Sequence, residues 1–95
     1  MQDFKDKVAV ITGAANGIGL DIAKALIRQG CHVVVSDIHL QDAQARADQL
    51  GAMPDATASA IAIACDVTDV AQINALADKA WAHFGHVDAL FNNAG

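Results

Sequence analysis

The sequence contains no tyrosine and no glutamate, and its 95 residues include only one proline, one tryptophan and two cysteines. All 11 acidic residues are therefore aspartates, and they outnumber the six lysines and arginines to give a net charge of −5. Nucleic acids and anionic membrane surfaces are bound through clustered basic residues. The acidic balance therefore argues against both of these as partners.

Long apolar runs are also absent. No stretch of the sequence approaches the roughly 20 consecutive apolar residues that a membrane-spanning helix requires. Residues 1–7, MQDFKDK, are polar and of mixed charge, unlike a signal peptide with its basic start and apolar centre. These features predict a cytoplasmic protein with no membrane partner.

Hydrophobic residues nevertheless make up 54% of the chain, whereas aromatic residues make up only 4%. This composition excludes a disordered chain and predicts a core that is built from small side chains. A chain of this length supports one modest core and not two. We therefore expect residues 1–95 to form a single domain.

Strand-like and helix-like segments alternate along the chain. Four apolar or β-branched runs predict buried strands: residues 8–11, 31–36, 61–65 and 87–91. Three segments with helical periodicity lie between them and end at glycines: residues 17–30, 40–51 and 69–85. This alternation predicts an α/β fold with a doubly wound parallel sheet in the order 3-2-1-4. The first two helices should cover one face of the sheet, and the third helix the other.

Each expected helix carries apolar residues on one face. In the first helix they are Ile18, Ile22, Ala25 and Leu26. In the third helix they form a longer set: Val70, Ile73, Leu76, Ala77, Ala80, Trp81 and Phe84. Either Thr68 or Asp69 is placed to cap this third helix.

The first strand is followed by residues 12–19, Thr-Gly-Ala-Ala-Asn-Gly-Ile-Gly. Glycines allow a sharp turn and a close approach of backbone to a ligand. The helix that follows presents unpaired N–H groups and the positive end of its dipole. We therefore expect N–H groups from Asn16 to Gly19 to face a nucleotide pyrophosphate; the alternative is a tight turn without a ligand. Thr12 is expected to be structural, with its hydroxyl bonded to backbone across the mouth of the sheet.

The spacing Gly13-x-x-x-Gly17-x-Gly19 resembles the Thr-Gly-x-x-x-Gly-x-Gly motif of the short-chain dehydrogenase/reductase family. Further stretches match that family in order: Asp37 after the second strand, Asp66-Val67 after the third, and Asn92-Asn93-Ala94-Gly95 after the fourth. The resemblance covers essentially the whole chain. It implies a Rossmann-type, NAD-binding domain that is truncated after its fourth strand. An intact protein would transfer hydride between NAD(H) and an alcohol or ketone, as an oxidoreductase.

Asp37 lies close to the roughly 20-residue offset from the glycines that is expected of a ribose-binding acid. Its carboxylate can accept from both hydroxyls of the adenosine ribose, and it would repel the 2′-phosphate of NADP. A lysine or arginine nearby would offset this repulsion. None occurs at the neighbouring positions, which are Ala14, Ala15, Asn16, Ile38 and His39. The prediction is therefore NAD; the alternative is a solvated loop acid.

The resemblance also implies roles at the other motifs. Ile18 would pack beneath the nicotinamide, or else be ordinary core. Asp66 would accept from the adenine amine, or else cap the next helix, and the Val67 N–H would donate to the ring. Asn92 would tie the fourth strand to its neighbour. The expected cofactor-binding residues are Gly13, Asn16, Gly17, Ile18, Gly19, Asp37, Ile38, Asp66, Val67, Asn93, Ala94 and Gly95.

No catalytic residue is expected within the chain. Family members that act on alcohols and ketones use a Tyr-x-x-x-Lys pair and an upstream Ser. This sequence has no Tyr, and neither Ser36 nor Ser59 matches the position of the catalytic Ser. Residues 1–95 alone are therefore predicted to be inactive, and an intact protein is expected to be a homo-oligomer. The main alternative function is a non-catalytic nucleotide-binding module. A methyltransferase-type sheet is a further alternative, but the three residues between Gly13 and Gly17 do not match the G-x-G-x-G spacing of that class.

Metal and disulfide sites are not expected either. His83 and His86 lack a third ligand at a suitable spacing. Cys31 begins the second strand and Cys65 ends the third, so parallel pairing at about 3.3 Å per residue would separate them by about 16 Å. A disulfide needs Cα atoms within about 7 Å. Both cysteines are therefore predicted to be free thiols, as in a reducing compartment.

Overall fold

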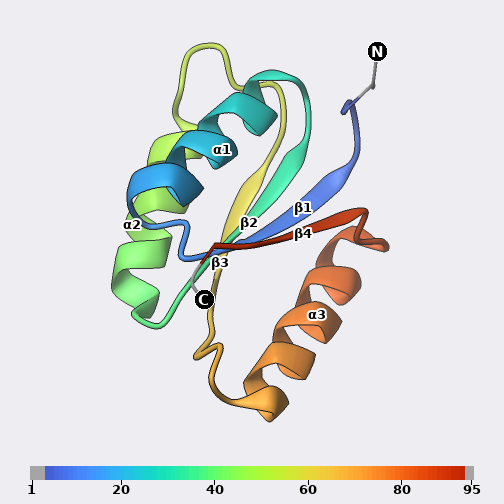
Figure 1. Ribbon diagram of the computed structural model, residues 1–95. Coiled ribbons are helices and arrows are strands. Elements are labelled where there is room, and N and C mark those ends of the chain that lie inside the picture. The colour runs from blue at the N-terminus through green and yellow to red at the C-terminus, as the bar shows by residue number, and fades with distance from the viewer. Residues whose placement is uncertain (1–3, 94–95) are drawn as a thin grey trace.

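The computed structural model describes residues 4–93. Four parallel strands form one sheet in the order β3-β2-β1-β4: β1 (Val8–Thr12), β2 (His32–Asp37), β3 (Ala60–Ala64) and β4 (Ala89–Asn92). Three helices connect them: α1 (Gly17–Arg28), α2 (Leu40–Gly51) and α3 (Val70–Phe84). The architecture confirms the predicted doubly wound, Rossmann-type sheet and its strand order (Figure 1).

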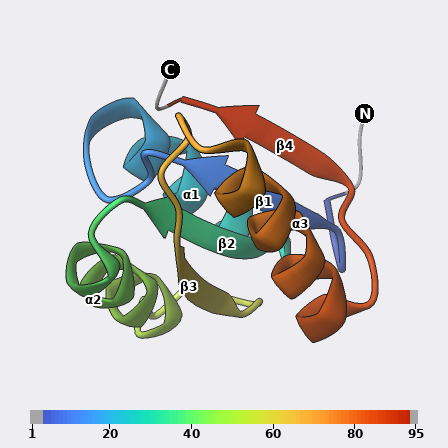
Figure 2. The same cartoon turned by 90° about the horizontal axis from the view of Figure 1, so that it is seen from below.

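Helices α1 and α2 lie on one face of the sheet and α3 lies on the other, as predicted (Figures 1 and 2). The register places Thr12 at the end of β1 beside Ser36 of β2 and Asn92 of β4. The carboxyl ends of these three strands are therefore level. The segments that follow the strands consequently emerge along one edge of the sheet, which we call the carboxyl edge.

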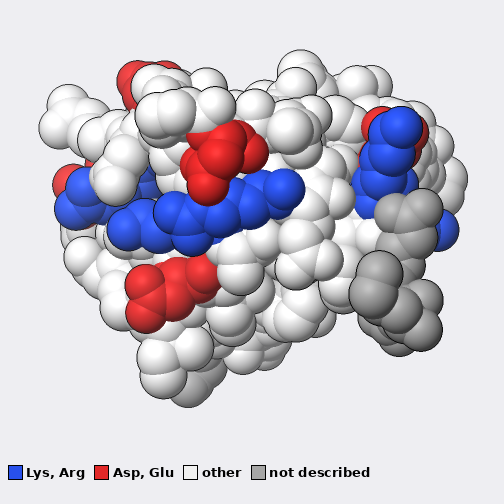
Figure 3. Space-filling view, turned by 90° about the horizontal axis from the view of Figure 1, so that it is seen from above, with Lys and Arg blue, Asp and Glu red and all other residues white. Residues whose placement is uncertain are grey.

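Charged side chains of both signs lie next to one another on the face that is seen from above (Figure 3). One ion pair joins Arg28 Nε, in the last turn of α1, to Asp55 Oδ2 in the loop before β3, at 2.9 Å. Both side chains of this pair are largely exposed, so solvent screens their attraction.

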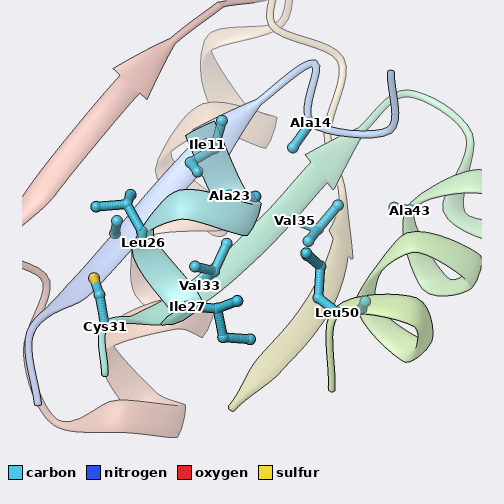
Figure 4. Close-up of a cluster of buried hydrophobic side chains, with 12 residues drawn as sticks. Ile11, Ala14, Ala23, Leu26, Ile27, Cys31, Val33, Val35, Ala43 and Leu50 are labelled. Atoms are coloured by element: carbon cyan, nitrogen blue, oxygen red, sulfur yellow. The ribbon is translucent and has the colours of Figure 1, made fainter. Parts of the chain in front are cut away.

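Side chains from the two faces of the sheet form two buried clusters. Ile11, Val33 and Val35 point toward α1 and α2 and pack with their small and aliphatic side chains (Figure 4). Val10 and Val34 point the other way, toward α3. Strands β1 and β2 are therefore covered on both faces, which explains their nearly continuous apolar sequences.

The apolar face that was predicted for α1 is confirmed in part, because Leu26 is buried and Ile22 packs against the core. The buried residues of the helix are Gly19, Ala23, Leu26 and Ile27, whereas Ala25 and Ile18 are exposed. The side that faces the sheet starts with the smallest residues, because α1 must begin close against the turn that follows β1. Close approach of the backbones thus decides which face is buried.

The predicted face of α3 is only partly buried. Leu76 and Ala80 are buried, but Val70 is 71% exposed and Trp81 is 57% exposed. On neighbouring β4, Leu90 is 60% exposed. Asp69 is the residue that caps α3, because its side chain accepts from the Ala71 N–H at 3.0 Å.

Both cysteines are buried and free, as predicted. Burial raises the pKa of the Cys31 thiol and of the Cys65 thiol. Raised values keep these groups as neutral thiols near neutral pH. They therefore behave as small apolar side chains of the core.

Candidate functional site

The glycine turn, residues 13–16, joins β1 to α1 at the carboxyl edge. Gly13 has φ = 64° and Gly17, the first residue of α1, has φ = 59°. Residues with a side chain rarely adopt this left-handed backbone conformation, which explains why each of these positions is a glycine. Ala14 and Ala15 between them are buried, so the turn packs down onto the domain.

Gly19 is required for a different reason, namely close contact. A Cβ atom at Gly19 would lie 2.6 Å from the Gly13 carbonyl oxygen and 2.8 Å from Asn93 Nδ2. A Cβ atom at Gly17 would meet nothing within 4 Å. The third glycine thus lets α1 pack against the turn, while the space beside the second stays open. This arrangement forms a cradle in which a ligand can approach the backbone.

The start of α1 is suited to bind an anion. The first N–H groups of a helix have no partner within the helix, and the dipole makes this end positive. Within the described part of the chain, the Asn16 side chain makes no capping hydrogen bond and no acidic residue occupies the first turn. The diphosphate of a dinucleotide fits this donor set.

Ile18 lies in the first turn of α1 and is 70% exposed. The alternative interpretation of this residue, ordinary core packing, is therefore wrong. Contact with a nicotinamide ring stays a prediction. A large exposed apolar side chain beside the cradle is consistent with it.

The ends of β2 and β3 meet the glycine turn in a cleft of about 280 Å³. Its lining residues come from three loops: Gly13, Asp37, Ile38, Cys65, Asp66, Val67 and Thr68. Asp37 is half-buried, and its Oδ1 accepts from the His39 N–H at 3.3 Å. The structure therefore brings together the residues that sequence reasoning placed at the adenosine end of a dinucleotide.

Asp66 is fixed by Thr68. One carboxylate oxygen, Oδ1, accepts from the Thr68 N–H at 2.9 Å and from the Thr68 hydroxyl at 2.7 Å. These hydrogen bonds lower the pKa of Asp66, so the carboxylate is ionised at neutral pH. The alternative role of Asp66 as the cap of α3 is wrong, because Asp69 is the cap. Val67 is half-buried beside Asp66, in the same cleft.

Thr12 links the two strands at the centre of the site. Its hydroxyl donates to Asn92 Oδ1 at 3.0 Å and accepts from the Asn93 N–H at 3.1 Å. Asn93 Nδ2 donates in turn to the Gly13 carbonyl at 3.3 Å. These bonds confirm the structural roles that were predicted for Thr12 and Asn92. Among the predicted ribose contacts, Ala94 and Gly95 lie outside the described residues.

Arg46 of α2 belongs to the site, although sequence reasoning did not include it. Its Nε donates to the Ala15 carbonyl at 2.9 Å, and its Nη1 donates to Gln49 Oε1 at 3.0 Å. Arg46 is adjacent in the sequence neither to the glycine motif nor to Asp37. Helical spacing was the available signal, because residue 46 borders the buried stripe of Ala43 and Ala47.

No three His, Cys, Asp or Glu side chains in residues 4–93 are grouped so that they could hold a metal ion. None of the helices described here combines the length and the apolarity needed to cross a membrane.

Sequence comparison matches residues 7–95 to the short chain dehydrogenase family. D-threitol dehydrogenase of Mycolicibacterium smegmatis is 44% identical over 98% of this chain and 35% of its own length. Galactitol 2-dehydrogenase of Agrobacterium fabrum is 43% identical over 96% of this chain and 33% of its own length. The chain therefore spans about a third of the length of the curated relatives it matches.

Solved structures show the same similarity. A hydroxysteroid dehydrogenase from Escherichia coli superimposes with a TM-score of 0.85 at 43% identity, over 97% of this chain and 38% of that chain. A short-chain type dehydrogenase/reductase from Mycobacterium ulcerans superimposes with a TM-score of 0.91, over 99% of this chain and 34% of that chain. Because its identity is 21%, the second comparison supports the fold alone.

Proposed function

The chain belongs to the short-chain dehydrogenase family, and we propose that it binds NAD across the carboxyl edge of its sheet. Members of the family typically use NAD or NADP. The observation that carries the proposal is the meeting of Gly13, Asp37 and Asp66 in one cleft beside the open start of α1. The diphosphate would lie on the amides of residues 16–19, and the adenosine at Asp37 and Asp66.

The choice of NAD over NADP follows from charge. Asp37 would accept hydrogen bonds from both ribose hydroxyls, whereas a 2′-phosphate would face its carboxylate. Arg46 could in principle offset that repulsion, but its Nε is directed to the Ala15 carbonyl and its Nη1 to Gln49. The preference for NAD therefore rests on the Asp37 carboxylate in the cleft.

Contacts to the rest of the dinucleotide follow the same edge. Asp66 would accept from the adenine amine, and the Val67 N–H would donate to the ring. Ile38, next to Asp37, would line the adenosine end. At the other end Ile18 would lie against the nicotinamide, and the backbone of residues 93–95 would approach its ribose.

The protein that contains this chain is proposed to transfer hydride between NAD(H) and an alcohol or ketone, as a cytoplasmic homo-oligomer. The dehydrogenase names of its relatives support this reaction class. Such chemistry needs an acid/base group within hydrogen-bond reach of the substrate oxygen. Residues 1–95 contain no tyrosine to serve in the family's way, so this part alone is proposed to bind without turnover.

Calorimetric titration of the purified protein with NAD and NADP tests the binding proposal. We expect NAD to bind and NADP to bind about tenfold more weakly or not at all, because like charges would meet at Asp37. Asp37→Asn should weaken NAD binding and should narrow the difference in affinity between NAD and NADP. Asp78→Asn, an exposed carboxylate on α3, is the control and should change neither affinity. Failure of both cofactors to bind would refute the proposal, and equal affinities would refute the preference.

The reading frame beyond codon 95 tests the catalytic part separately. A downstream Ser and Tyr-x-x-x-Lys pair would support hydride transfer by the whole protein. A downstream segment without them would leave a nucleotide-binding module that has no turnover of its own.

A further inference from the structure

Three successive residues of the glycine turn are each tied to a different element. The Gly13 carbonyl accepts from Asn93 after β4, and the Ala14 N–H donates to the Ser36 carbonyl of β2 at 3.2 Å. The Ala15 carbonyl accepts from Arg46 of α2 at 2.9 Å. The first two anchors come from the sheet edge itself. The third is the only one of these three made by a charged side chain.

We infer that Arg46 is a positioning residue for the phosphate-binding turn, because it fixes the peptide unit between Ala15 and Asn16. This inference rests on the proposed binding of NAD. The peptide unit is planar, and its carbonyl and N–H point in opposite directions. Because the carbonyl is held toward α2, the Asn16 N–H is directed away from α2.

The peptide unit needs such an anchor because a glycine follows Asn16. Asn16 is in an extended conformation, and Gly17 follows it with positive φ. Glycine permits many backbone conformations, so the helix does not by itself determine how this peptide is turned. The Arg46 contact therefore selects one orientation of the Asn16 amide before any ligand arrives.

Arg46 is itself held in place. The α2 helix is fixed on the sheet through buried Ala43, Ala47 and Leu50. The Nη1 atom of the guanidinium donates to Gln49 in the next turn of the helix. The helix that carries Arg46 is therefore anchored on the sheet, and its guanidinium has a second hydrogen bond, as a positioning group requires.

Two substitutions separate the hydrogen bond from the charge. Glutamine places a neutral donor, Nε2, at the same number of bonds from Cα as Nε of arginine, whereas methionine places a methyl group there. Arg46→Met should weaken NAD binding about five- to tenfold, since one positioned hydrogen bond is lost. Arg46→Gln should stay within about twofold of the original affinity. Adenosine, which has no diphosphate, should bind equally to all three proteins.

Arg28→Met is the matched control, because Arg28 is the other arginine of the chain and pairs with Asp55 at the surface. It should leave NAD affinity unchanged. Unchanged NAD affinity in Arg46→Met would overturn the inference. So would equal losses in Arg46→Met and Arg46→Gln, which would indicate a charge effect. Equal losses for NAD and adenosine would indicate a general loss of structure instead.

Backbone 15N relaxation without ligand gives an independent readout. The NMR order parameters of Asn16 and Gly17 should be lower in Arg46→Met than in the original protein, and Arg46→Gln should restore them. If the original protein binds no NAD, the proposed function fails, while this measurement still decides whether Arg46 orders the turn. Equal order parameters in all three proteins would overturn the ordering role.

Discussion

The two faces of the sheet differ in how completely they are covered. On the face of α1 and α2, the sheet-facing residues of α2 are fully buried. On the opposite face, only Leu76 and Ala80 of α3 are buried, and Val70, Trp81 and Leu90 are more than half exposed. Exposed apolar side chains of this size mark a surface that is meant to be covered. The proposed nucleotide site draws its contacts chiefly from the well-covered half of the molecule.

A small apolar hollow of about 120 Å³ lies between α3 and the β1–β4 side of the sheet. Val10, Leu76 and Leu90 are among its lining residues. The family relatives are about three times as long as this chain. We therefore expect further parts of the whole protein to cover this face, whereas the glycine turn is already complete in residues 4–93.

The largest expected effect is a difference in the free energy of unfolding between two leucine variants. Leu50→Ala should lower the free energy of unfolding by about 3 kcal/mol, because Leu50 is fully buried and its removal leaves a cavity. Leu90→Ala should cost less than about 1 kcal/mol, since most of its side chain is already in water. Chemical denaturation of the two variants measures the difference. Equal costs would mean that Leu90 is covered in solution, for example by self-association.

A second comparison uses two glycines. Gly19→Ala should lower stability by about 2 kcal/mol, because the new Cβ would press on the backbone carbonyl of Gly13. The same change should also weaken NAD binding, since α1 would move away from the turn. Gly51→Ala, at the end of α2 with open space around it, should be neutral or stabilising by up to about 1 kcal/mol. Denaturation and titration of both variants test this pair. A Gly19→Ala protein with unchanged stability and unchanged NAD affinity would contradict the close contact.

The smallest expected effect is a dependence on pH at Asp66. Its pKa is lowered in the folded chain by the hydrogen bonds from Thr68. The folded state therefore gains stability above the ordinary pKa of an Asp, and loses it as the pH falls through the lowered value. Thr68→Val removes the hydroxyl donor and should move the pKa of Asp66 upward, toward the ordinary value. NMR titration of the carboxylate measures both proteins, and an unchanged pKa would show that the backbone N–H alone sets it.

Most of the fold follows from local patterns in the sequence. The alternation of strands and helices, the glycines that end helices and the crossover rule together predict the sheet order. Asp37 and the Asp66-Val67 pair could be placed at one edge for the same reason. Parallel strands have their carboxyl ends at the same edge of the sheet, so the residues that follow neighbouring strands lie together at that edge.

The errors arise where packing across elements decides. Helical periodicity placed Ala25 on the buried face of α1, but the close approach at Gly19 turns Ala23 and Ile27 inward instead. Periodicity also cannot tell how much of the apolar face of α3 will find a partner. Arg46 was missed because its contact with Ala15 spans 31 residues, and no local rule connects these two positions.

The hydrogen bond from Asn93 to Gly13 has a kinetic consequence, because it joins residues 80 positions apart. Contacts between such distant positions form late in folding, after the costly closure of a long loop. A chain leaving the ribosome would thus expose a glycine turn that lacks one of its three anchors until β4 docks beside β1. The chain would then bind nucleotide tightly only after β4 has been synthesised and has paired with β1.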